Sequence, residues 1–158
     1  GFPAGVVAGS WAAGRLVTTP LARVAIGTVL LCASFALIQA MLPGLTPARL
    51  WPLRVGMLAA GAAMGLTVTS VMQLGMSELP KALAGAGAGA IQTMQQVSMA
   101  ASIALSLAVY GQALEARPGL EAASVMMWLQ IGGTGTAALL ALALLRRTIL
   151  TDRKAKAC

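Results

Sequence analysis

Four long stretches of the chain contain no Asp, Glu, Lys or Arg, and they cover residues 24–48, 55–77, 83–114 and 122–145. Each is longer than the roughly 18–20 residues that an α-helix needs to cross a hydrocarbon core about 30 Å thick. The stretches do not alternate apolar with polar residues, as a membrane-spanning strand does over about ten positions. The pattern therefore predicts an all-α fold, a polytopic bundle of transmembrane helices.

Proline, glycine and charged residues separate these stretches and predict one membrane domain, residues 1–150, followed by a basic, frayed cytoplasmic tail over 151–158. The expected helices cover about residues 1–16, 21–42, 53–76, 85–114 and 120–150. The first uncharged stretch, residues 1–14, would form only about 21 Å of helix. We therefore expect the first helix to be truncated, with its beginning missing from this sequence.

Composition and charge agree with a membrane protein. Only 9% of the 158 residues are charged and 58% are hydrophobic, whereas a soluble domain is about a quarter charged. The net charge is +7, but the basic residues lie between apolar stretches and do not form a basic face with aromatic residues. The expected partner is therefore the lipid bilayer, and no nucleic acid is expected.

The distribution of Lys and Arg predicts the orientation, because cytoplasmic loops carry an excess of these residues. Alternate loops lie on opposite sides of the membrane, and one side holds the larger group: Arg15, Arg23, Lys81, Arg146, Arg147, Arg153, Lys154 and Lys156. The other side holds Arg49, Arg54 and Arg117. We therefore expect a multi-pass protein of the cell (inner) membrane with a cytoplasmic C-terminus.

Polar side chains gather in the third and fourth expected helices, whereas the second is almost wholly apolar. An unpartnered amide costs a few kcal/mol in hydrocarbon, so the third and fourth helices should face protein or a water-filled cavity, and the second should face lipid. The candidates for lining a substrate cavity are Thr67, Ser70, Gln73, Gln92, Gln95 and Gln96.

In the fourth helix, a step of about 100° per residue places several of these polar groups on one stripe. Its members are Gln92, Gln95, Gln96, Met99, Ser106 and Tyr110. The stripe fits the lining of a polar pathway, and it fits equally well hydrogen bonding to neighbouring helices or loop backbone.

Small residues at four-residue spacing are candidates for close helix packing. They form the pairs Gly61 and Gly65, Gly85 and Gly89, and Ser98 and Ser102.

The sequence offers no catalytic set. It has no histidine, its acidic residues lie outside the apolar stretches, and its two cysteines are Cys32, within such a stretch, and the last residue, Cys158. The glycine run at residues 85–89 lacks the Lys and Ser/Thr of a phosphate-binding loop. We expect no enzymatic activity, no cofactor and no metal.

The segment Gly14-Arg15-Leu16 resembles the start of the cytoplasmic G-R-L-x-D-R-x-G loop of major facilitator superfamily transporters. Thr18 and Thr19 stand where that loop has Asp and Arg. A longer pattern is similar to the late helices of the fourteen-helix drug:proton antiporters of this superfamily. It runs through Gly61-Ala-Ala-Met-Gly65, Glu78-Leu-Pro80, Gly85-Ala-Gly-Ala-Gly89, Gln92-Thr-Met-Gln95-Gln96 and Ser98-Met-Ala-Ala-Ser102.

The resemblance covers nearly the whole chain and implies part of the C-terminal half of such a transporter. It implies proton-coupled export of drugs or other amphipathic small molecules by alternating access. The third and fourth helices would line the central cavity, and the second and fifth would be peripheral. Missing N-terminal helices would supply the proton-binding acid, because no acid lies within these spans, and the chain alone would not transport.

A small membrane scaffold or assembly protein is the alternative, and it would explain why the spans hold no titratable acid. The reading frame upstream of Gly1 separates the two hypotheses. Many further apolar stretches there favour the transporter, and a start codon immediately upstream favours the scaffold.

The predicted orientation can be tested with Cys158, after Cys32 has been replaced by Ser so that one thiol remains. In intact cells, a membrane-impermeant thiol reagent should leave Cys158 unlabelled until the membrane is permeabilised. Labelling before permeabilisation would place the C-terminus outside and refute the topology.

Overall fold

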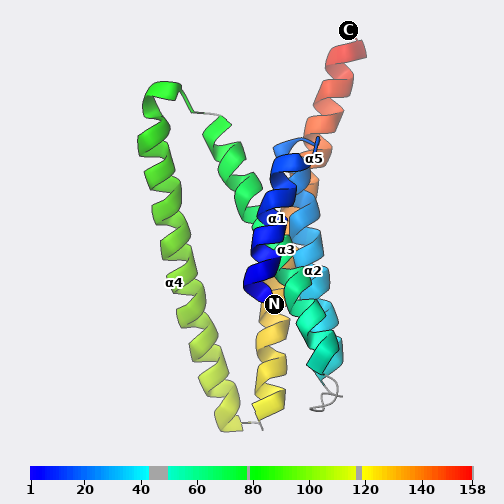
Figure 1. Ribbon diagram of the computed structural model, residues 1–158, viewed down its shortest axis with the longest axis vertical. Helices are drawn as coiled ribbons and strands as arrows, with labels where there is room; N and C mark the ends of the chain where they lie inside the picture. Colours follow the sequence, from blue (N-terminus) through cyan, green and yellow to red (C-terminus); the bar gives the residue numbers. More distant parts are fainter. Residues whose placement is uncertain (43–49, 78, 117–118, 158) are drawn as a thin grey trace.

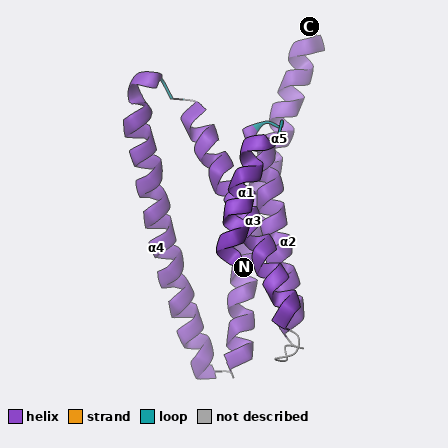
Figure 2. Ribbon diagram, viewed as in Figure 1, coloured by secondary structure: helices purple, strands orange, loops and turns teal. Residues whose placement is uncertain are grey.

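The computed structural model describes residues 1–42, 50–77, 79–116 and 119–157, and in these ranges every regular element is helical (Figures 1 and 2). The α-helices are α1 (Phe2–Arg15), α2 (Pro20–Met41), α3 (Leu50–Ser77), α4 (Ala84–Ala116) and α5 (Gly119–Ala157), with a 3-10 turn, η3 (Lys81–Leu83), before α4. In the described ranges, α2, α3, α4 and α5 are long and apolar enough to cross a membrane. The predicted all-α bundle with a short first helix is confirmed.

The helix α5 extends into the residues that the sequence assigns to the tail. The helix continues through Ala157. Neither glycine nor proline occurs after Gly135, and Ala, Arg and Lys are among the best helix formers. Because nothing in the sequence stops the helix at Leu150, it runs on past the apolar stretch.

The helix α3 lies at the centre of the bundle, with α1 and α2 packed against it, α5 packed against α2, and α4 standing apart (Figure 1). In the most apolar part of α3, 39% of the residues are buried, whereas in the corresponding part of α4 none is buried. The helices α3 and α4 therefore have different environments, although both carry several polar residues.

The tightest contact in the bundle joins α1 to α3 through glycine. A Cβ atom added at Gly9 would overlap the carbonyl group of Ala62, and one added at Gly65 would overlap the carbonyl oxygen of Val6. Gly5 and Gly61 meet the partner backbone in the same way. Two GxxxG segments thus face each other, which lets the helix backbones touch directly.

The expectation that the second helix faces lipid more than the third and fourth holds against α3 but is wrong against α4, because α2 packs against both α3 and α5 while α4 stands apart. Four of the five buried residues of α2 are small, namely Ala25, Gly27, Thr28 and Ser34, and the fifth is Ile38. Thr28 and Ser34 donate hydrogen bonds to carbonyl oxygens one turn earlier in α2, at Val24 (2.9 Å) and Leu30 (2.8 Å). Their hydroxyl groups are therefore satisfied locally, and they pack as small residues at a helix interface.

The substitution Gly9→Ala tests the α1–α3 contact. The added methyl group would force the two backbones apart, and such overpacking typically costs about 1–3 kcal/mol. The thermal unfolding midpoint of the detergent-solubilised protein, followed by circular dichroism, should fall.

Gly14→Ala is the matched control, because Gly14 lies on the same helix and a Cβ there would meet nothing within 4 Å. Replacing this helical glycine should leave the midpoint unchanged or raise it, since Ala is the better helix former by about 1 kcal/mol. Equal midpoints for the two variants would contradict the glycine-mediated contact.

Candidate functional site

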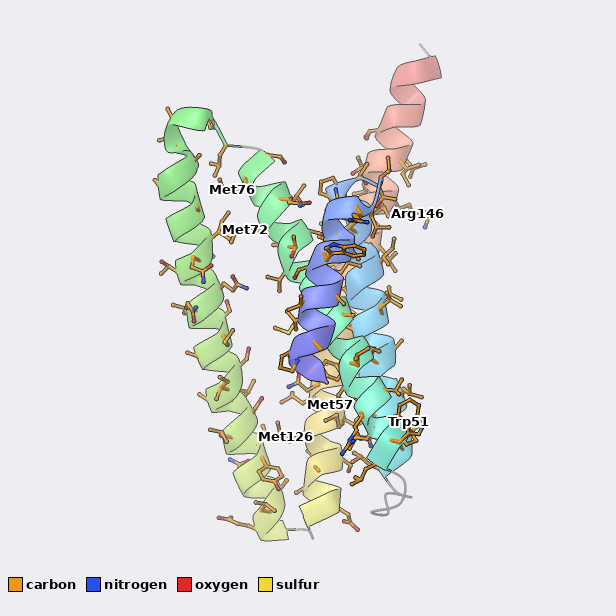
Figure 3. All side chains as sticks on the ribbon, in the orientation of Figure 1. Trp51, Met57, Met72, Met76, Met126 and Arg146 are labelled. Carbon is orange, nitrogen blue, oxygen red and sulfur yellow. The ribbon has the colours of Figure 1, made fainter. Side chains whose placement is uncertain are left out.

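A trough runs along the inner face of α4, where this helix stands off from α3 and α5. Its first part is a hollow of about 420 Å³ between α3 and α4. The lining residues are Thr67, Val68, Val71, Met72, Ile91, Met94, Gln95 and Ser98. Met72 points from α3 into the space between α3 and α4 (Figure 3).

The trough continues between α4 and α5 as a hollow of about 590 Å³. The lining residues are Met99, Ser102, Ile103, Ser106, Leu107, Tyr110, Ala123, Met126, Met127 and Gln130. A smaller hollow of about 300 Å³ shares Ser102, Ser106 and Gln130 and reaches Gly133 and Thr134 on α5. Since Ser98 ends the lining of the first hollow and Met99 begins the second, these two follow one another along α4, and the third lies beside the second.

The helix α4 approaches its neighbours at its two ends and stands away from them in the middle. Near its N-terminus, the side chain of Ile91 packs against Gly75 on α3. A Cβ atom added at Gly75 would lie 2.8 Å from this side chain. Near its C-terminus, Ser106, Val109 and Tyr110 are half-buried. All residues from 96 to 105 are exposed. The central part of the trough is therefore open, and small serine side chains contribute to its width.

The lining combines apolar and polar but uncharged groups. Methionine is unbranched and polarizable and adapts to irregular shapes. The hydroxyl group of Thr67 donates to the Ala63 carbonyl oxygen (2.8 Å), and that of Ser102 donates to the Ser98 carbonyl oxygen (2.8 Å). Each hydroxyl oxygen keeps its capacity to accept a hydrogen bond. The trough can therefore hold an apolar molecule and offer hydrogen bonds at several points along it.

The structure divides the six cavity candidates predicted from the sequence into four groups, of which the fourth is Gln73, an acceptor for Arg23 outside the trough lining. Thr67 and Gln95 line the trough. Ser70 is completely buried and donates to the Leu66 carbonyl oxygen (2.6 Å) within α3. Gln92 and Gln96 are exposed and do not line the hollow between α3 and α4.

The three small-residue pairs also differ in what they contact. Gly61 and Gly65 contact α1, whereas a Cβ at Gly85 or Gly89 would meet nothing within 4 Å. Ser98 and Ser102 line the trough. Four-residue spacing alone does not distinguish a contact surface from a cavity wall.

Most of the α5 side of the trough, including Met126, Met127 and Gln130, was not predicted from the sequence. The signal on that helix was its few polar residues within residues 122–145, among them Gln130 and Thr134. Gly5 and Gly9 were not predicted as packing residues either, although their spacing matches that of Gly61 and Gly65.

A second polar centre surrounds Arg23, at the start of α2. Its guanidinium group donates to the carbonyl oxygen of Thr18 (3.1 Å) in the α1–α2 link and to the side-chain oxygen of Gln73 (2.8 Å) on α3. It also donates to the carbonyl oxygen of Ala13 near the end of α1. Arg23 thus joins three parts of the chain, and the cavity candidate Gln73 serves as one of its acceptors.

The segment Gly14, Arg15 and Leu16 lies beside this centre. The Arg15 guanidinium carbon lies 4.0 Å from the centre of the Trp11 ring, a cation–π contact within α1. Leu16 follows the last residue of α1 and is exposed. Arg23, on α2, and not Arg15, donates the hydrogen bonds that join α2 to this link and to α3.

No protein-family model, curated protein or solved structure matches the chain.

The substitution Gln73→Leu tests the Arg23 centre. It removes an acceptor from a half-buried cation, and the loss of one partner of such a hydrogen bond typically costs about 1–3 kcal/mol. The thermal unfolding midpoint in detergent should fall. Gln92→Leu removes an exposed amide and should leave the midpoint nearly unchanged, so equal effects of the two substitutions would refute the structural role of Gln73.

Proposed function

We propose that this chain forms part of the membrane domain of a secondary active transporter, with the trough along α4 as one wall of the substrate pathway. The substrates would be drugs or other amphipathic small molecules, exported by alternating access. The observation that carries the proposal is the trough itself: an uncharged lining that mixes methionine with amide, hydroxyl and phenol groups, between helices long enough to cross a membrane.

The composition of the trough supports this substrate class. Small-molecule sites are mostly apolar, with a few polar groups that orient the ligand. Flexible methionine-rich surfaces can repack around ligands of different shape. Among the described residues, no Asp, Glu, Lys or Arg lines any of the three hollows, so recognition would depend on shape, dispersion and hydrogen bonding.

In this proposal, export would be coupled to the movement of protons. An intramembrane carboxylate is the usual proton-binding group of a transporter, and residues 24–48, 55–77, 83–114 and 122–145 contain none. In the complete transporter this acid would come from helices outside the chain. The partial likeness of Gly14, Arg15 and Leu16 to the major facilitator loop supports this assignment.

The same absence of acid is the observation that favours the alternative, a membrane scaffold or assembly protein. In a scaffold the trough would be filled permanently by another helix and would carry no solute. The two functions therefore differ in whether a side chain facing the trough affects export.

Gln95→Leu and Gln96→Leu provide a matched test. Both remove an amide at roughly constant volume from adjacent residues at the same depth, but only Gln95 lines the trough. Efflux of an amphipathic fluorescent dye should be measured in cells that express the whole reading frame encoding this chain, and normalised to the amount of protein in the membrane. Gln95→Leu should slow efflux roughly two- to tenfold, the range expected for one hydrogen bond.

Gln96→Leu should leave efflux unchanged. Equal efflux in both variants and the wild type would remove the trough from the transport pathway. An absence of dye efflux in the wild type, together with normal membrane abundance, would favour the scaffold.

A further inference from the structure

A second, chemically different groove lies between α2 and α5. It has a volume of about 280 Å³, and every described residue that lines it is aliphatic. The lining residues are Ala22, Ala25, Ile26, Val29, Leu30, Leu142 and Leu145. Unlike the trough along α4, this groove offers no side-chain hydrogen bond, so an occupant would be an aliphatic chain.

One end of the groove meets a basic residue on the same face of α5. The lining residue Leu145 is followed directly by Arg146. At about 100° per residue, Arg146 lies about 40° around the helix from Leu142, whereas Arg147 lies about 140° away. Both arginines are exposed, but only Arg146 continues the stripe that lines the groove.

The position of Arg146 along α5 also fits a lipid headgroup. The uncharged stretch of α5, residues 122–145, is about 36 Å long as a helix, enough to cross a hydrocarbon core of about 30 Å. Arg146 therefore lies at the level where the hydrocarbon gives way to headgroups. Figure 3 shows it where α5 leaves the bundle.

The neighbouring cation at this end of α2 is already engaged. Arg23 donates to Thr18 and Gln73, on the link before α2 and on α3. Arg23 and Arg146 both make this end of the groove positive, but the Arg23 guanidinium already donates to protein oxygens, so the exposed Arg146 is the cation that can bind a headgroup.

We propose that this groove binds an anionic phospholipid, with one acyl chain against the aliphatic lining and the phosphate group at the Arg146 guanidinium. The planar guanidinium group binds phosphate oxygens in a bidentate manner. Basic pockets between transmembrane helices bind acidic headgroups in the same way. This inference is independent of transport, since the groove shares no residue with the trough along α4.

The headgroup contact is tested by Arg146→Gln against Arg147→Gln, which remove the same charge from adjacent residues on different faces of α5. The full chain in detergent is mixed with phosphatidylglycerol or phosphatidylcholine of identical acyl chains, and the retained lipids are counted by native mass spectrometry. The wild type should retain phosphatidylglycerol preferentially, by roughly fivefold for one basic residue near an anionic headgroup. Arg146→Gln should lose this preference, and Arg147→Gln and Arg146→Lys should keep most of it.

The acyl contact is tested by Val29→Trp, which fills the groove, against Leu37→Trp on the same helix outside it. Both side chains are partly exposed, by 42% and 46%, so both variants should fold. Val29→Trp should reduce the retention of both lipids several-fold relative to Leu37→Trp.

Three results would overturn the proposal. Equal loss of preference in Arg146→Gln and Arg147→Gln would mean that net charge alone attracts the lipid. Equal lipid retention in Val29→Trp and Leu37→Trp would exclude the groove. Binding of inorganic phosphate that depends on Arg146, together with an ineffective Val29→Trp, would show a site for a free anion instead of a lipid.

Discussion

In a bilayer, helices gain little by burying apolar side chains against one another, because lipid tails are equally apolar. Close backbone packing must supply much of the attraction, and in this protein the facing glycines of α1 and α3 provide it. Gly5 and Gly9 lie against residues 58–62 of α3, and Gly61 and Gly65 lie against residues 2–10 of α1. With α1 fixed on one face of α3 and α2 on another, α4 is left beside a third part of the surface.

The second constraint is that polar groups within hydrocarbon need partners. Most hydroxyl groups of the bundle find them in their own helix, as Ser70 does with Leu66 and Thr28 with Val24. These residues therefore pack as small side chains. Two polar contacts join helices that are distant in sequence: Arg23 donates to Gln73, 50 residues away, and the Cys32 thiol donates to the carbonyl oxygen of Ile131, 99 residues away.

These two constraints leave two openings of contrasting chemistry. The trough along α4 mixes methionine with uncharged polar groups, which suits a small amphipathic molecule. The groove between α2 and α5 is wholly aliphatic and ends beside Arg146, which suits a phospholipid. Both openings involve α5, which the family resemblance had implied to be peripheral.

The sequence by itself determined the all-α class, the approximate helix bounds and the helices that carry polar groups, because hydropathy and turn residues act locally. It did not determine which face of each helix meets a neighbour. Gln95 and Gln96 are adjacent residues of the same type, yet only Gln95 lines the trough. Gly61–Gly65 and Gly85–Gly89 have the same spacing, yet only the first pair contacts another helix. A contact depends on the partner helix, on the angle at which it crosses and on the complementary residues that it presents, and only the tertiary structure decides these.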